Sequence, residues 1–235
     1  MRKIEICCGS VDDVVAARVG GASRIELCSA LDLGGVTPSA GLIVGAIREK
    51  GEMNVNVLIR PRQGDFIYTP HEVSVMEADI AAAREAGADG VVIGALLPDG
   101  SMDMATVSRL VRAAKGMDIT FHRAFDECAD PFAALEQLVD LGIPRLLTSG
   151  MAASAQEGLP LISKLVRQAS GRISIMPGAG INPGNIREIA AESGATEFHS
   201  TASDKEETLR VSRLFGPLPR ATKAETVRAL VESIR

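Results

Sequence analysis

Four stretches decide the fold: GGASRIEL (20–27), AGADGVVI (86–93), LGIPRLLT (141–148) and SGATEFHS (193–200). In each, a glycine is followed by two or three residues and then by a run with the composition of a strand. Glycine in this position typically ends a helix in the left-handed conformation. The stretches therefore predict a helix, a sharp turn and a strand, repeated four times along the chain.

Between these stretches lie four further strand-like runs, within residues 2–8, 54–62, 118–126 and 173–180. The segments connecting all eight runs have helical periodicity, as in VDDVVAARVGG, where Val11, Val14 and Val15 share one face. Eight strands alternating with helices in 235 residues favour a (β/α)₈ TIM barrel over an open doubly wound sheet. The first turn, CCGSVD, also lacks a dinucleotide-binding fingerprint. We therefore expect one TIM-barrel domain over residues 1–235, with residues 203–220 forming a long loop before the last helix.

Composition limits the function. The chain carries a net charge of −5, its aromatic content is 3%, and no basic tract is interleaved with aromatics, so nucleic-acid binding is not expected. No apolar run is long enough for a membrane span, and the first residues do not resemble a signal peptide. Four cysteines do not make a disulfide framework in a chain of this length. These features predict a cytoplasmic protein with no nucleic-acid or membrane partner.

Alternation along the strands predicts which side chains point into the barrel. The apolar residues must face the helices, so their polar neighbours face inward. Five ionisable side chains are thereby expected to converge in the barrel interior: Glu5, Glu26, Arg60, His122 and His199. One interpretation is a structural network in which Glu26 pairs with Arg60. So many ionisable groups from separate strands favour instead a functional cavity at the carboxyl ends of the strands, where barrel active sites lie.

Loops at the same end add candidate residues. The stretch TFHRAFD (120–126) contributes Asp126 as a further candidate for acid–base chemistry and Arg123 as a candidate anion ligand. Arg62 could bind an anion beside Arg60 or form a loop salt bridge with Asp65, and both interpretations stay open. A glycine-rich loop before a helix predicts an anion site on backbone N–H groups, with candidate residues Gly180, Asn182 and Asn185.

Two thiols occupy matching positions on adjacent strands. Cys7 and Cys28 each lie two residues beyond an inward glutamate, so both sulfurs could reach one soft ion such as copper(I) or zinc. Buried free cysteines also commonly serve as small hydrophobic residues, and two thiols fall short of a structural zinc site.

The sequence resembles the CutC copper-homeostasis family. The resemblance is carried, in order along about residues 4–202, by IEICC, RIELCSALDLGGVTPS, IRPRQGDFIY, TFHRAFD, LTSG, IMPGAGI and FHS. It implies a TIM barrel, a cytoplasmic location, a homo-oligomer (we favour a dimer) and a role in copper handling. It also implies Cys7 and Cys28 as the copper(I) ligands, with no organic cofactor. Residues 203–220 carry no motif shared with the family.

Two functions follow as hypotheses. The first is a copper homeostasis protein that binds copper(I) through thiols. The second is a barrel enzyme that performs acid–base chemistry on a small anionic or phosphorylated metabolite, because a copper carrier has no evident need for so many inward acids and bases. A barrel that serves only as an interaction scaffold is the third alternative.

Overall fold

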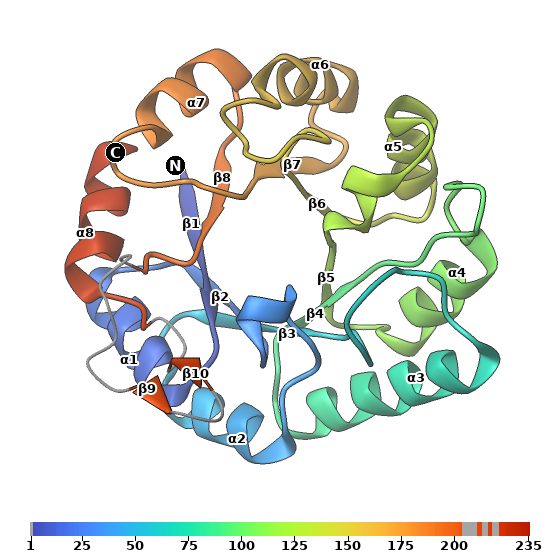
Figure 1. Ribbon diagram of the computed structural model, residues 1–235, viewed down its shortest axis with the longest axis horizontal. Helices are drawn as coiled ribbons and strands as arrows, with labels where there is room; N and C mark the ends of the chain where they lie inside the picture. The colour runs from blue at the N-terminus through green and yellow to red at the C-terminus, as the bar shows by residue number, and fades with distance from the viewer. Residues whose placement is uncertain (1, 204–210, 213–215, 218–220) are drawn as a thin grey trace.

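The computed structural model describes residues 2–203, 211–212, 216–217 and 221–235. Viewed down its short axis, it is a ring of strands surrounded by a ring of helices (Figure 1). The strands are β1 (Lys3–Cys8), β2 (Arg24–Leu27), β3 (Asn54–Leu58), β4 (Gly90–Ile93), β5 (Asp118–Phe121), β6 (Arg145–Thr148), β7 (Ser174–Pro177) and β8 (Glu197–Ser200). The helices are α1 (Val11–Gly20), α2 (Ala40–Glu49), α3 (Pro70–Glu85), α4 (Met104–Ala113), α5 (Pro131–Asp140), α6 (Leu159–Ala169), α7 (Ile186–Ser193) and α8 (Ala224–Ser233).

All eight strands run parallel, in the order β7-β6-β5-β4-β3-β2-β1-β8, and β7 and β8 lie against each other where the ring closes. Each strand is followed by a helix, with two short 3₁₀ segments, η1 (Leu31–Leu33) and η2 (Arg123–Glu127), at the carboxyl ends of β2 and β5. The predicted (β/α)₈ TIM barrel is confirmed.

Local sequence explains where the helices begin and end. Thr69 and Glu72 form a capping box at the start of α3, and Pro131 occupies the first turn of α5. Both features satisfy or remove N–H groups that have no partner inside the helix. The four glycines of the repeat have the predicted left-handed backbone, with φ of 88°, 91°, 68° and 73° at Gly21, Gly87, Gly142 and Gly194. Each turns the chain from a helix into the next strand.

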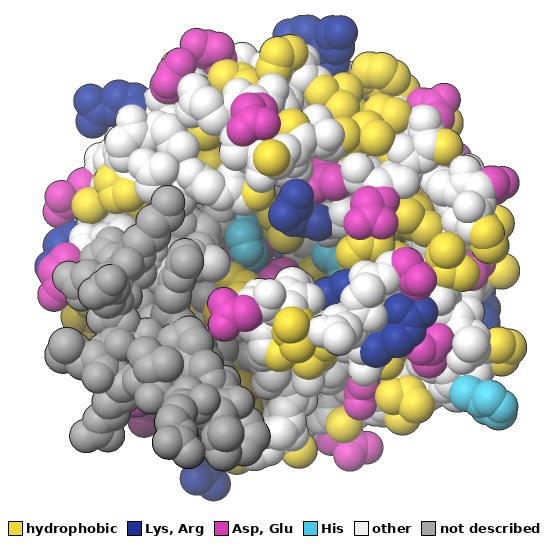
Figure 2. All heavy atoms as spheres, in the orientation of Figure 1, with side chains coloured by type: hydrophobic (Ala, Val, Ile, Leu, Met, Phe, Trp, Pro, Cys, Tyr) yellow, Lys and Arg dark blue, Asp and Glu magenta, His cyan; other side chains and the backbone are white. Residues whose placement is uncertain are grey.

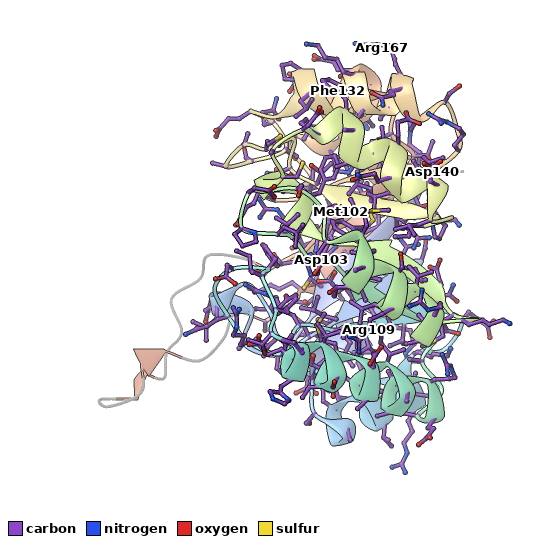
Figure 3. The ribbon with its side chains drawn as sticks, turned by 90° about the vertical axis from the view of Figure 1, so that its right-hand side faces the viewer. Met102, Asp103, Arg109, Phe132, Asp140 and Arg167 are labelled. Atoms are coloured by element: carbon purple, nitrogen blue, oxygen red, sulfur yellow. The ribbon has the colours of Figure 1, made fainter. Side chains whose placement is uncertain are left out.

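The apolar core lies between the strands and the helices. It contains the outward residues of each strand, such as Ile4, Ile6 and Phe121. Seen from the side, the helices lie next to one another around the sheet, with Arg109 of α4 beside α3 (Figure 3). Arg109 forms an ion pair of 2.8 Å with Glu77 of α3. The alternation predicted for the strands is therefore confirmed, and it leaves the barrel interior to the polar residues.

Residues 203–220 were predicted to form a long loop. Within this range the described residues are Ser203, which makes a bridge with Thr222, and two short antiparallel strands, β9 (Val211–Ser212) and β10 (Gly216–Pro217). The other residues of the predicted loop lie outside the described part of the chain.

Candidate functional site

A cavity of about 240 Å³ opens at the carboxyl ends of the strands. Figure 2 shows the hollow at the centre of this face, with histidine side chains visible inside it. Most of the predicted site residues line it: Cys7, Glu26, Arg60, His122, Arg123, Gly180 and His199. They come from six different β/α units, and the barrel brings them to one place because all parallel strands end on the same face.

The remaining predicted residues lie around this cavity. Glu5 is fully buried beneath it, and Cys28 lies behind Cys7. Asp126, Arg62, Asn182 and Asn185 belong to the surrounding loops and do not line the cavity.

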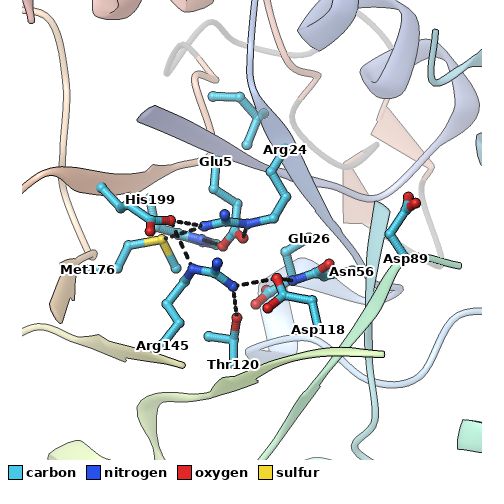
Figure 4. A network of polar contacts seen from close by, with 12 residues as sticks. Glu5, Arg24, Glu26, Asn56, Asp89, Asp118, Thr120, Arg145, Met176 and His199 are labelled. Carbon is cyan, nitrogen blue, oxygen red and sulfur yellow. Dashed lines mark hydrogen bonds and ion pairs between the residues drawn. The ribbon is translucent and has the colours of Figure 1, made fainter. Parts of the chain in front are cut away.

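An ion network forms the floor of the barrel (Figure 4). Arg24 binds Glu5 and lies 2.7 Å from Glu197, and Arg145 lies 2.8 Å from Glu197 and 2.7 Å from Asp118. Buried charges of this kind are costly unless each has a partner. The network therefore contains three carboxylates and two guanidinium groups, and a third positive charge would balance it.

His199 supplies that charge. Its Nδ1 lies 2.8 Å from Oε1 of Glu5. Burial alone would lower the pKa of His199, but the hydrogen bond to Glu5 and the charges of Glu26 and Glu5 raise it above its usual value. Burial would likewise raise the pKa of Glu5, but Arg24 and His199 together lower it to about 2. Both shifts favour the charged forms, a carboxylate on Glu5 and an imidazolium on His199, and the two charges offset each other.

Glu26 and the two thiols form a second group beside His199. Cys7 Sγ lies 3.4 Å from Oε1 of Glu26 and 3.6 Å from Sγ of Cys28. Burial raises the pKa of Glu26, and the hydrogen bond with Cys28, followed by burial, raises the pKa of the Cys7 thiol well above its usual value. Ligand atoms of Cys7, Glu26 and His199 all lie within 4.8 Å of one another. This group could hold a metal ion if it lost its protons.

His122 is a neutral imidazole in an apolar setting. Burial, and then the charge of Arg60, lower its pKa to about 3. Its Nδ1 accepts a hydrogen bond of 3.1 Å from the Ala124 N–H, so the proton of the neutral ring is on Nε2, which is buried without a partner. The ring packs against Phe66, with centroids 4.9 Å apart. His122 therefore presents a hydrogen-bond donor at neutral pH.

Arg60 is buried and has no ion-pair partner among the described residues. The interpretation that it pairs with Glu26 is wrong, because its guanidinium turns away to the loops. It donates to the carbonyls of Gly35 at 2.9 Å and Gly64 at 2.6 Å, with a longer bond to Leu33, and its carbon lies 4.9 Å over the Phe66 ring. Its Nε is buried without a partner.

Asp126 holds the loop after β6 in place. It accepts hydrogen bonds from Thr148, from both the N–H and the hydroxyl of Ser149, and from Met151, and it pairs with Arg123 at 2.7 Å. With its oxygens so fully used, Asp126 orients Arg123 at the cavity wall. Proton transfer by Asp126 stays a prediction.

Arg62 lies outside the cavity. Its guanidinium binds Asp65 at 2.8 Å and Glu72 at 2.6 Å, so the loop salt bridge that was one of its two interpretations is present.

In the glycine-rich loop after β7, several hydrogen-bond donors already bind acceptors within the same loop. The Asn182 N–H donates to Asn185 Oδ1 at 2.9 Å, the Gly184 N–H donates to Asn182 Oδ1 at 2.9 Å, and both side-chain amides donate to the Gly180 carbonyl. Anion binding by these residues stays a prediction, and it would require displacing these internal hydrogen bonds.

Sequence reasoning did not select Arg24, Arg145 or Asp118, which complete the ion network. The signal was present, because Arg24 and Arg145 each precede an outward apolar residue, Ile25 or Leu146, and alternation then turns both arginines inward.

Comparison with known proteins identifies the family. The model of the CutC family matches residues 2–204. The chain belongs to the CutC family. A CutC family protein of Parabacteroides distasonis is 51% identical over 201 residues, covering 86% of this chain and 83% of the relative. The human copper homeostasis protein cutC homolog is 51% identical over 199 residues, covering 85% of this chain and 72% of the relative.

Solved structures agree with the CutC assignment. The crystal structure of CutC from Streptococcus agalactiae has a TM-score of 0.81 and 36% sequence identity, covering 86% of this chain and 99% of that chain. The thiamine phosphate pyrophosphorylase of Pyrococcus furiosus, with a TM-score of 0.63 and 15% identity, covers 99% of this chain and 95% of its own, and shares the fold alone. Within the described residues, no helix combines the length and the apolar character needed to cross a membrane.

Proposed function

We propose that this CutC family member binds copper(I) through the thiolates of Cys7 and Cys28. The observation that carries the proposal is the distance of 3.6 Å between the two sulfur atoms, one of which lines the cavity. Thiolates are soft ligands and select soft ions such as copper(I). The human relative is called a copper homeostasis protein, which agrees with this cargo.

His199 is the third donor available to the ion. Its Nδ1 binds Glu5 at 2.8 Å, so its Nε2 is the nitrogen left for a ligand. Histidines that bind metals usually donate their other N–H to a carboxylate in this way. The pKa values of Cys7 and His199 are both raised, so copper(I) competes with protons for these two ligands. The cargo is therefore held more tightly as the pH rises.

Anaerobic titration with copper(I) against a chromophoric competitor tests this proposal. Cys7→Ser and Cys28→Ser should each weaken binding by at least tenfold. Cys128→Ser is the matched control, because Cys128 is also a buried free cysteine but lies with the outer core. If all three variants bind as the parent does, the two thiols are not the ligands.

A second function is favoured by buried polar atoms that have no partner. Glu26 Oε2 and His122 Nε2 are both in this state, and both residues line the cavity. Buried polar groups normally have hydrogen-bond partners, so such atoms suggest a missing ligand. We therefore propose, as the alternative, acid–base chemistry on a small anionic metabolite. Glu26, whose pKa is raised by burial, would deliver a proton, and the neutral His122 would donate a hydrogen bond to a substrate oxygen.

Thermal shift with a panel of small metabolites, phosphorylated and not, tests this alternative. A stabilising metabolite should lose its effect in Glu26→Gln and His122→Asn but keep it in His71→Asn, since His71 is exposed at the start of α3. Stabilisation that survives both cavity substitutions would place the metabolite elsewhere. The absence of any stabiliser would contradict the acid–base function.

A further inference from the structure

Hydrogen-bond donors dominate the polar lining of the cavity. His122 presents its Nε2–H, which is buried without a partner. Arg60 and Arg123 add two guanidinium groups, which are donors only. A ligand that satisfies these donors must be rich in acceptors, and the buried charge of Arg60, which has no carboxylate partner among the described residues, favours an anion.

Arg60 is the strongest sign of a missing partner. The residue is 6% exposed, it touches no carboxylate among the described residues, and its bonds go to three carbonyl groups. Burying a charge is costly unless an opposite charge lies beside it. The Nε–H has no partner, and the adjacent Nη2, which donates to the Gly64 carbonyl, carries a second hydrogen. Two parallel N–H groups of this kind match the two oxygens of a carboxylate.

We propose that the cavity binds a small organic acid whose carboxylate pairs with Arg60, with Arg123 as a second contact at the cavity wall. This inference rests on the metabolite site proposed above and names its substrate class. Arg123 is suited to this role because it is half-exposed and already oriented by Asp126 and by Ser149, at 2.7 and 2.9 Å. A ligand in a cavity of 240 Å³ replaces roughly eight water molecules, which suits a compact acid.

The features that would favour a phosphate are weak. In many barrels the loops after the seventh and eighth strands bind phosphate through backbone N–H groups. Here two of those N–H groups, on Asn182 and Gly184, already donate to asparagine side chains. Arg62, a further cation near the cavity, is committed to Asp65 and Glu72. A monoanionic carboxylate needs only the charge of Arg60, and Arg123, already paired with Asp126, adds a hydrogen-bond contact.

Three-carbon probes that differ in one group separate these chemistries: glycerate, glycerol 3-phosphate and glycerol. Isothermal titration of the full chain should detect glycerate, and also lactate, but neither glycerol nor glycerol 3-phosphate at the same concentrations. Arg60→Gln should weaken glycerate binding by about tenfold or more, because a hydrogen bond to a charged group is lost. Arg62→Gln is the matched control and should bind as the parent does.

Arg123→Gln provides a second variant that avoids the core, so the test stands even if Arg60→Gln does not fold. It should weaken glycerate binding several-fold. Failure of both carboxylates to bind the parent chain, or binding unchanged in both cavity variants, would overturn the inference. Glycerol 3-phosphate binding that depends on Arg60 would also overturn it but leave the metabolite site standing. A metabolite from the thermal-shift panel whose stabilising effect is lost in His122→Asn but kept in Arg60→Gln would likewise overturn the carboxylate inference and leave the metabolite site standing.

Discussion

His199 and Glu5 form a buried pair in which Nδ1 and Oε1 lie 2.8 Å apart, and the other oxygen of Glu5 binds Arg24. The charge of a cavity residue is therefore set by an ion network one layer below it. The same hydrogen bond orients the imidazole, so that its other nitrogen is left for whatever the cavity binds. The Glu5 carboxylate therefore influences both the charge and the orientation of the His199 ring.

Glu5→Gln should lower the pKa of His199, because the substitution keeps the shape of the side chain and removes the charge that holds the proton. An NMR titration of the His199 ring measures this directly. The same variant should lose about 3–5 kcal/mol of unfolding free energy, since Arg24 is left with one carboxylate partner. Glu136→Gln, which breaks a surface pair with Arg172, is the control and should leave the denaturation midpoint nearly unchanged. An unchanged His199 pKa in Glu5→Gln would mean that other groups hold its proton.

Acid should destabilise the protein in two steps. The pKa of His122 is about 3 in the folded protein, against an ordinary value of 6.5. Between these values the unfolded chain binds a proton at His122 and the folded chain does not. The free energy of unfolding therefore decreases as the pH drops below 6.5. Glu5 has a folded pKa of about 2 against an ordinary 4.5, so the stability it provides above pH 4.5 is lost as the pH falls towards 2. The two shifts correspond to about 5 and about 3 kcal/mol at most.

Urea denaturation at a series of pH values checks these steps. His122→Asn keeps an acceptor for the Ala124 N–H and removes the titrating ring, so it should flatten the curve between pH 6.5 and 4.5. The part of the loss below pH 4.5 that comes from Glu5 should remain. A variant whose curve overlays that of the parent would show that His122 is protonated in the folded state.

Copper(I) affinity should rise steeply with pH if the thiols are the ligands. The pKa of the Cys7 thiol is raised well above its usual value, so this residue releases a proton when it binds the ion as a thiolate. The proton lost from Cys7 should therefore increase the logarithm of the apparent affinity by about one for each pH unit, and this part of the slope should disappear in Cys7→Ser. Competition titrations from pH 6 to 8 measure the slope. A slope near zero would exclude binding through protonated thiols.

The strand alternation made the fold and most of the cavity predictable. Outward residues such as Ile6 and Phe121 must be apolar to pack on helices, and this requirement alone turns Glu5 and His122 inward. The glycines that end helices were equally predictable from the sequence. Gly21 and Gly194 have a left-handed backbone conformation, which other residues adopt only at a cost in free energy.

Strand alternation did not predict which inward side chains form ion pairs with one another. Glu26 lies on β2, but Arg60 lies two residues beyond the end of the neighbouring strand β3, and its guanidinium donates to loop carbonyls instead. A long side chain such as that of Arg60 can extend toward the barrel interior or toward the loops. Which direction it takes depends on the hydrogen-bond acceptors that the loops provide. The partners of Glu5 illustrate the same limit, because Arg24 and His199 both point to it from opposite neighbouring strands.

Gly94, directly after β4, is a position where a side chain would clash with the cavity residue His122. A Cβ there would lie 2.4 Å from Cε1 and 2.6 Å from Nδ1 of His122, whose ring is confined by Phe66 and Phe121. Gly94→Ala should therefore displace the imidazole and lose about 1–3 kcal/mol of unfolding free energy. Gly41→Ala is the matched control, because Gly41 lies exposed on α2 with open space around it, and it should gain up to about 1 kcal/mol.

The steric origin of the effect can be isolated with a double variant. In a His122→Ala background the clash is gone, so Gly94→Ala should cost much less than it does in the parent chain. Chemical denaturation gives the four free energies, and the His122 ring signals in the parent and in Gly94→Ala report the displacement. If Gly94→Ala costs the same in both backgrounds, His122 does not confine this glycine, and the cavity wall is looser than its contacts imply.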